Sequence, residues 1–115
     1  MNRRLPEEPV DAEGFRERGN RYGRYGNYDM AIRDLSRAIE LEPEFADTYY
    51  DRGCSFYEVG MYDEAVADLS RAIELNPQGA KYYSQRSIVY LFMDQMVLAE
   101  ADQETSDSLR EQGFE

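Results

Sequence analysis

The octapeptide DLSRAIEL occurs twice in this chain, at residues 34–41 and again at residues 68–75. Two identical octapeptides separated by 34 positions are hard to obtain by chance. A fixed period of this length is typical of proteins built from stacked units, because a single unit cannot bury its own apolar face. This repeat therefore constrains the fold more strongly than any other feature of the sequence.

The 34-residue register defines three consecutive segments, residues 12–45, 46–79 and 80–113. Aligned positions agree in kind: two are aromatic, one is glycine or serine, one is alanine, and proline closes the first two segments. The aligned sets are Phe15/Tyr49/Tyr83, Tyr22/Phe56/Tyr90, Gly19/Gly53/Ser87, Ala31/Ala65/Ala99 and Pro43/Pro77. The three segments are therefore copies of one structural unit.

Each segment is predicted to form two helices. Pairs such as Phe15 and Tyr22 are seven residues apart and share one face of the first helix, and the second helix has an apolar stripe at helical spacing in the first two segments. The first helices are expected at residues 12–25, 46–59 and 80–93, and the second helices at residues 28–41, 62–75 and 96–109.

Short signals mark where these helices begin and end. Asp11 is expected to cap the first helix through its carboxylate. Gly26 and Gly60 are expected to end two first helices, because glycine readily adopts the left-handed conformation. Residues 1–11 are predicted to be a flexible N-terminal leader, and their two arginines precede no apolar run, so no signal peptide is expected.

Taken together, these residues resemble the tetratricopeptide repeat family. The resemblance covers the aromatic positions, Gly19 and Gly53, the aligned alanines and the prolines. It implies an all-α fold, a right-handed α-solenoid of three helix-turn-helix repeats with six helices, in one domain spanning residues 12–113. The third repeat departs from the pattern, with Ser87, Gln103 and Glu111 at the glycine, leucine and proline positions.

The last predicted helix also differs from its two counterparts in polarity. Three aligned positions are apolar in the first two repeats and polar in the third, namely Ile32/Val66/Glu100, Leu35/Leu69/Gln103 and Ile39/Ile73/Asp107. A terminal repeat needs a polar outer face because no further repeat covers it. The third repeat is therefore expected to act as a polar cap on a three-repeat array.

Charged residues recur in the same register. Arginine occupies positions 18, 52 and 86, and aspartate occupies positions 34, 68 and 102. These residues are predicted to pair across each helical hairpin, since the resemblance implies such a pair. The alternative is a ladder of arginines that binds anions.

Composition excludes several classes of function. The formal net charge of −11 opposes binding to nucleic acid and to anionic membranes. The Arg-, Gly- and Tyr-rich stretch at residues 18–28 resembles an RNA-binding segment, but the repeat register already assigns it to packing and turns. The absence of histidine and the single Cys54 leave no metal, cofactor or catalytic constellation, so we expect a cytoplasmic, non-enzymatic protein.

The resemblance places a binding groove along the first helices of the three repeats. Helical spacing independently sets Arg16, Asn20 and Arg24 on one stripe. The expected partner is a protein or peptide segment that combines carboxylates with an apolar anchor. The predicted groove residues are Arg16, Asn20, Arg24, Tyr50, Asp51, Cys54, Tyr57, Lys81, Ser84, Ile88 and Leu91.

Two alternatives to this adaptor function remain open. One is self-association, possible as a homodimer, through exposed aromatic residues. The other is a carboxylate clamp, which a subfamily uses to hold the C-terminal carboxylates of heat-shock chaperones. Arg16, Asn20 and Lys81 match positions of that clamp, whereas Asp51 and Gln85 depart from it, and the acid would repel the ligand.

Overall fold

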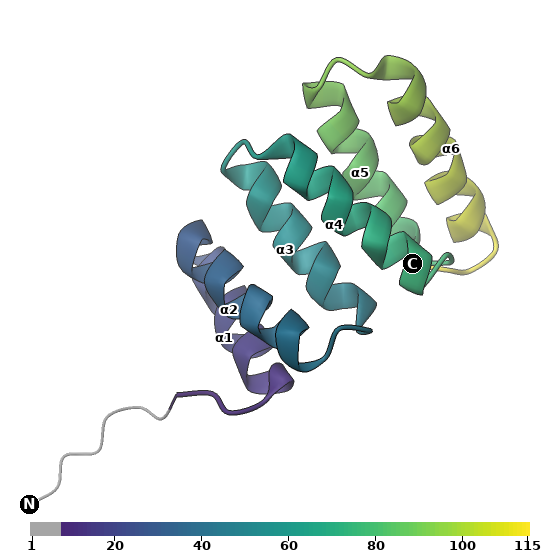
Figure 1. Cartoon of the computed structure of the whole chain (residues 1–115). Coiled ribbons are helices and arrows are strands. Elements are labelled where there is room, and N and C mark those ends of the chain that lie inside the picture. Colours follow the sequence, from purple (N-terminus) through teal and green to yellow (C-terminus); the bar gives the residue numbers. More distant parts are fainter. Residues whose placement is uncertain (1–7) are drawn as a thin grey trace, which may run out of the picture.

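Six α-helices, paired in three antiparallel hairpins, make up the part of the chain that the computed structural model describes, residues 8–115 (Figure 1). The predicted flexible leader falls largely on residues 1–7, which lie outside the described residues. The helices are α1 Ala12–Arg24, α2 Tyr28–Leu41, α3 Ala46–Glu58, α4 Tyr62–Leu75, α5 Ala80–Phe92 and α6 Met96–Glu111. The all-α architecture of stacked hairpins, a solenoid, is as the repeat predicts.

The helix boundaries follow the sequence closely. Helices α2 and α4 have the predicted bounds, and α1, α3 and α5 each end one residue earlier than predicted. Helix α6 continues two residues beyond the predicted end at Leu109. The third repeat has Glu111 where the first two have proline, so nothing there interrupts the helical hydrogen bonds.

The expected signals act at the helix ends. The side chain of Asp11 accepts a hydrogen bond from the backbone N–H of Gly14 at 2.8 Å, which confirms the predicted cap. Gly26 and Gly60 have φ values of 79° and 81°, the predicted left-handed conformation. In the third hairpin the aligned residue is Asp94, with φ 60°, a conformation that aspartate tolerates better than most side chains.

The hairpins close tightly where the repeat places small residues. A Cβ atom on Gly19 would lie 2.9 Å from Cγ of Leu35, and one on Gly53 would lie 3.1 Å from Cγ of Leu69. Both leucines are fully buried, as is Val89 on α5. Glycine thus lets the two helices of a hairpin approach each other closely, and the leucine of the second helix fills the contact.

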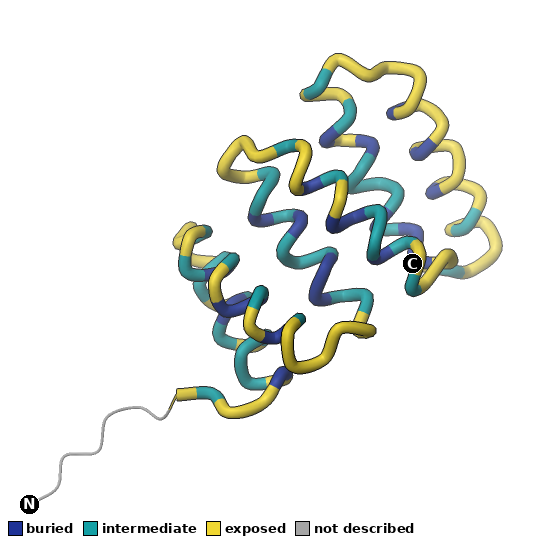
Figure 2. The backbone as a smooth tube through the Cα atoms, in the orientation of Figure 1, coloured by how far each residue is buried: buried dark blue, intermediate teal, exposed yellow. Residues whose placement is uncertain are grey.

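The six helices form two layers. The first helices of neighbouring repeats, α1, α3 and α5, contact one another in sequence, whereas α2, α4 and α6 make no direct contact among themselves. Helix α2 instead packs on α3, and α4 packs on α5, the first helix of the next repeat in each case. We call α1, α3 and α5 the inner layer. Figure 2 shows buried positions where the layers meet and exposed ones at the turns and along the outer side of α6.

The predicted arginine–aspartate pairs are confirmed in all three repeats. Each arginine donates from Nε and Nη2 to both carboxylate oxygens at 2.7–2.8 Å: Arg18 to Asp34, Arg52 to Asp68 and Arg86 to Asp102. The aspartates are buried and the arginines about one-fifth to one-quarter exposed. With these donors engaged, the arginines serve as scaffold and do not form an anion ladder.

The same arginines also connect neighbouring repeats. Nη1 of Arg52 donates to Oγ of Ser36, and Nη1 of Arg86 donates to Oγ of Ser70, both at 3.0 Å. Arg18 has no preceding repeat within the described residues, and its Nη1 donates instead to Glu8 at 2.9 Å. Each arginine therefore fixes both its own hairpin and the stacking on the element before it.

The outward face of α6 is polar over its middle and apolar at its start. Glu100, Gln103 and Asp107 are exposed, and the amide of Gln103 donates to Asp107 at 2.9 Å. The first turn of α6 nevertheless exposes Met96, Val97 and Leu98, which the polar-cap prediction did not include. Within residues 8–115, no helix has the length and apolar character needed to cross a membrane.

Candidate functional site

The eleven predicted groove residues all lie on the inner layer, on three adjacent helices. Helix α1 carries Arg16, Asn20 and Arg24; α3 carries Tyr50, Asp51, Cys54 and Tyr57; α5 carries Lys81, Ser84, Ile88 and Leu91. Arg24, Ile88 and Leu91 are exposed, and the others are partly buried. The surface they form has a charged centre, an aromatic and apolar end at the hairpin turns, and a mixed end at the opposite edge.

Asp51 lies at the charged centre. Its carboxylate accepts a hydrogen bond from the amide of Asn20 at 3.0 Å. Burial raises the pKa of Asp51, and the nearby carboxylate of Asp47 raises it further, while the Asn20 hydrogen bond and the charges of Lys81 and Arg16 oppose this shift. Three of the positions that match the carboxylate clamp thus surround an acid of this chain's own.

Lys81 is already engaged with α3. Its Nζ lies 3.3 Å from the Asp47 carboxylate and 4.9 Å from the ring centre of Tyr50. The ring of Tyr50 packs on the ring of Tyr82 with 5.5 Å between centroids, and the Tyr82 hydroxyl donates to Asp47. Lys81 and Tyr50 therefore hold α3 against α5, and a ligand would have to compete with these contacts.

Cys54 follows Tyr50 by one helical turn. Burial raises the pKa of the Cys54 thiol to about 12, and it raises the pKa of Tyr50 as well. A thiol with this pKa is almost wholly protonated near neutral pH and is a poor nucleophile. Cys54 is thus a weakly polar wall residue of the site rather than a reactive group.

A hollow of about 430 Å³ opens between α1 and α3 beside Cys54. Its lining combines charged and small residues: Gly19, Asn20, Gly23, Arg24, Tyr28, Asp51, Cys54, Ser55 and Glu58. Gly23 is not required for packing, because a Cβ there would meet Ala31 Cβ at 3.9 Å and Ser55 Oγ at 4.0 Å, which are ordinary contacts. The missing side chain instead leaves room in the hollow.

The turn end of the inner layer is aromatic and apolar. The ring of Tyr57 makes an edge contact with Phe92, with 5.4 Å between centroids, and both rings pack on Tyr62. Ile88 and Leu91 are 37% and 47% exposed beside this cluster. The arrangement presents two aliphatic side chains next to a rigid aromatic wall, which suits an apolar anchor of a ligand.

A second hollow, of about 550 Å³, lies at the opposite end of α3 and α5. Phe45, Asp47, Lys81, Tyr82, Phe114 and Glu115 are among its lining residues. The backbone carbonyl of Glu115 accepts a hydrogen bond from the N–H of Lys81 at 3.0 Å. The residues that follow α6 therefore return to the first turn of α5.

The sequence-based prediction missed three phenylalanines of this site, Phe45, Phe92 and Phe114. The guanidinium of Arg16 lies 4.3 Å from the ring centre of Phe45. Phe92 extends the apolar end, and helical spacing from Ile88 would have indicated it, since position 92 lies one turn further along the same face. Phe45 and Phe114 gave no such signal, because neither has an aromatic counterpart in the other repeats.

The chemistry that this site offers is recognition by charge, hydrogen bonding and apolar contact. Among residues 8–115, no group of three or more Asp, Glu or Cys side chains is arranged to hold a metal ion.

Comparison with known proteins gives matches in family models and in solved structures. One family model, described as "Tetratricopeptide repeat", matches residues 46–78, and another, described as "TPR repeat", matches residues 19–60. Together they cover residues 19–78, just over half of the chain. No curated protein matches the chain in sequence.

The solved structures are similar in fold over most of the chain. "Second TPR of Spaghetti (RPAP3) bound to HSP90 peptide SRMEEVD" has a TM-score of 0.84 and 27% identity, over 86% of this chain and 92% of that one. "Crystal structure of MamA" has a TM-score of 0.85 and 27% identity, over 89% of this chain and 60% of that one.

A third structure, "YrrB: a TPR protein with an unusual peptide-binding site", has a TM-score of 0.83 and 19% identity, over 88% of this chain and 52% of that one. At that identity the likeness concerns the fold alone, and this chain spans little more than half of either YrrB or MamA. The two family models and the three stacked hairpins agree, and the chain belongs to the tetratricopeptide repeat family.

Proposed function

We propose that this chain binds a peptide or partner-protein segment in the groove of the inner layer and has no catalytic activity of its own. The observation that carries the proposal is the hollow between α1 and α3, with Arg24 and Asn20 on one wall, Cys54 on the other, and the exposed Ile88 and Leu91 further along the same layer. Membership of a protein-interaction family supports it, as does the peptide bound to the similar RPAP3 domain.

The groove suits a ligand with carboxylates at one end and an apolar side chain at the other. Arg16 and Arg24 supply positive charge on α1, and Arg24 is exposed. Ile88 and Leu91 on α5 lie beside the ring wall formed by Tyr57 and Phe92. A segment running across the inner layer would meet the arginines of α1 first and the aliphatic side chains of α5 last. The charged contacts would then set the register of the bound segment, and the apolar contacts would supply its affinity.

The test is capture of partners by the immobilised chain, with identification by mass spectrometry. Arg16→Glu/Arg24→Glu should remove the specific partner, because it reverses the charge on α1. Arg33→Glu is the matched control, since Arg33 is exposed on α2, away from the inner layer. A segment of the identified partner is then synthesised and titrated. Equal affinity of that segment for the wild type and the double variant would refute the groove assignment.

The carboxylate clamp is a second, separately testable candidate. Arg16, Asn20 and Lys81 gather around Asp51, but Asp51 occupies the Asn20 amide and Asp47 engages Lys81. We therefore expect the wild-type chain not to bind the peptide SRMEEVD, and Asp51→Asn/Gln85→Arg to gain measurable affinity in a calorimetric titration. Binding of that peptide by the wild type would instead establish the clamp in this chain.

A further inference from the structure

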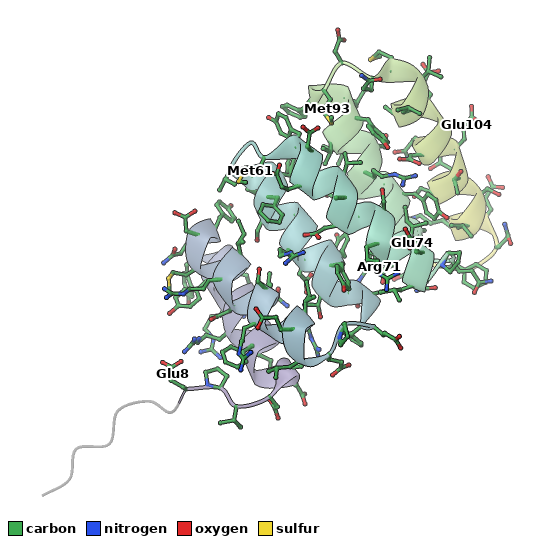
Figure 3. All side chains as sticks on the ribbon, viewed as in Figure 1. Glu8, Met61, Arg71, Glu74, Met93 and Glu104 are labelled. Carbon is green, nitrogen blue, oxygen red and sulfur yellow. The ribbon has the colours of Figure 1, made fainter. Side chains whose placement is uncertain are left out.

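The three hairpin turns lie in a row along one edge of the molecule (Figure 1). We call residues 21–29, 58–64 and 91–100 the turn edge. It exposes large apolar side chains in every hairpin: Tyr25 (83%), Val59 (39%), Met61 (42%), Phe92 (60%), Met96 (53%) and Val97 (80%). Figure 3 shows Met61 at the middle turn with Met93 in the next hairpin along. Large apolar side chains exposed in three neighbouring turns are typical of a surface that another molecule covers.

The charge of the turn edge changes sign from one end to the other. The first turn carries Arg21 and Arg24 with one acid, Asp29. The last turn carries Asp94 and Glu100, and no lysine or arginine occurs anywhere between residues 87 and 109. The edge is therefore cationic at the first hairpin and anionic at the third, with apolar side chains at both ends.

We propose that the turn edge binds the turn edge of a second copy of this chain, antiparallel, about a two-fold axis through the middle hairpin. In a two-fold interface, each contact between two different residues occurs twice, once on either side of the axis. The first turn of one copy then faces the last turn of the other, so Arg21 and Arg24 meet Asp94 and Glu100. Tyr25 packs against Phe92 and Val97, and Val59 and Met61 of the two copies meet at the axis.

The charges of the two end turns favour the antiparallel over the parallel arrangement. A parallel dimer would set arginine against arginine and acid against acid. End-to-end stacking on the outer face of α6 would bury Gln103 and Asp107, which are polar and exposed. Anionic ligands are repelled by the last two turns. Near the axis, the acidic side chains of the middle turn (Glu58, Asp63 and Glu64) face the same three side chains of the second copy. The repulsion between these carboxylates keeps the dimer weak and reversible.

A charge-swap experiment on the full chain tests the proposal, with molar mass measured by sedimentation velocity from about 1 μM to about 1 mM, the range of weak protein association. The wild type should rise from 13.4 kDa towards twice that mass. Variant A is Arg21→Glu/Arg24→Glu, which makes both ends of the edge anionic. Variant B is Gln95→Lys/Glu100→Lys, which makes both ends cationic. Each alone should associate at least tenfold more weakly than the wild type.

Mixing A with B should restore a one-to-one dimer, because each end of A then faces an oppositely charged end of B. Arg33→Glu and Glu104→Lys are controls for net charge, since Arg33 is exposed on α2 and Glu104 on the outer side of α6 (Figure 3), and both should dimerise like the wild type. Val97→Asp tests the apolar contact without disturbing the fold, because Asp29 and Asp63 occupy the aligned positions.

Val97→Asp should weaken association at least tenfold and leave the thermal unfolding midpoint unchanged at about 1 μM, where the wild type is still monomeric. Three results would each overturn the proposal: a wild type that stays at the monomer mass throughout, a mixture of A and B that stays monomeric while the wild type dimerises, and a mixture that grows into longer assemblies.

Discussion

Gly19 and Gly23 lie one turn apart on α1, and the same change to alanine should have opposite effects at the two positions. At Gly19, which is buried, a Cβ would lie 2.9 Å from Leu35 Cγ and 3.2 Å from Asp34 Cβ. At Gly23 the nearest atoms are 3.9 Å and 4.0 Å away. The first position is overfilled by a methyl group, whereas the second accepts it at normal contact distance.

The magnitudes follow from two competing terms. Alanine gains up to about 1 kcal/mol over glycine in a helix interior, and overpacking a tight core costs about 1–3 kcal/mol. Leu35 is fully buried, so its side chain cannot shift towards solvent to make room. Asp34 is held by two hydrogen bonds from Arg18. Gly19→Ala should therefore lower the free energy of unfolding by about 1–2 kcal/mol. Gly23→Ala should raise it by about 0.5 kcal/mol, less than the full propensity gain because α1 ends at the next residue.

Urea unfolding followed by far-ultraviolet circular dichroism measures the difference. Two variants that differ by about 2 kcal/mol should have urea midpoints about 1 M apart for a chain of this size. A Gly19→Ala midpoint equal to or above that of Gly23→Ala would refute the close-approach reasoning. Gly23→Ala gives a second readout, because it narrows the hollow beside Cys54 and should weaken capture of the groove partner while stability rises.

Three further predictions follow from burial and pairing. Leu69→Ala should lower the free energy of unfolding by about 3 kcal/mol, whereas Gln103→Ala at the aligned, exposed position of α6 should leave it unchanged; urea unfolding measures both. Asp68→Ala should lower it by about 2–3 kcal/mol, because the Arg52 guanidinium loses its carboxylate partner. Replacement of Glu74 is the control and should change it little, because its ion pair with Arg71 is exposed. Iodoacetamide should alkylate Cys54 at least tenfold more slowly in the folded chain than in urea at pH 8. Because the pKa of this thiol is raised on folding, its contribution to stability should be constant below about pH 8.5, the thiol pKa in the unfolded chain, and fall above it. Cys54→Ala should flatten that fall.

The 34-residue register predicts most of the fold because it indicates how the two helices of each repeat pack against each other. Helix bounds, the close approach at Gly19 and the Arg52–Asp68 pair all lie inside one hairpin, so each is encoded by local spacing. The three arginine–aspartate pairs are more buried than a surface ion pair, since the hairpin covers their aspartates almost completely. Sequence spacing fixes which residues face one another but not how far solvent is excluded around them.

Contacts between repeats are less visible in the sequence. The hydrogen bond from Asn20 to Asp51 and the ion pair of Lys81 with Asp47 join side chains more than 30 positions apart, and both depend on the tilt between stacked hairpins. The register shows that these residues share the inner layer, but not that Asp51 takes up the Asn20 amide. Glu8, which replaces a serine of the preceding repeat as partner of Arg18, lies outside the register altogether.

The three copies agree at several scaffold positions and disagree along the inner layer. The arginine–aspartate pairs and the aligned alanines are identical, whereas one groove position reads Arg16, Tyr50 and Ser84, and the next reads Asn20, Cys54 and Ile88. Along the inner layer the copies diverge without loss of the fold. Along this layer the divergence produces a gradient from charge on α1 to aliphatic side chains on α5, and an extended ligand can read such a gradient in only one direction.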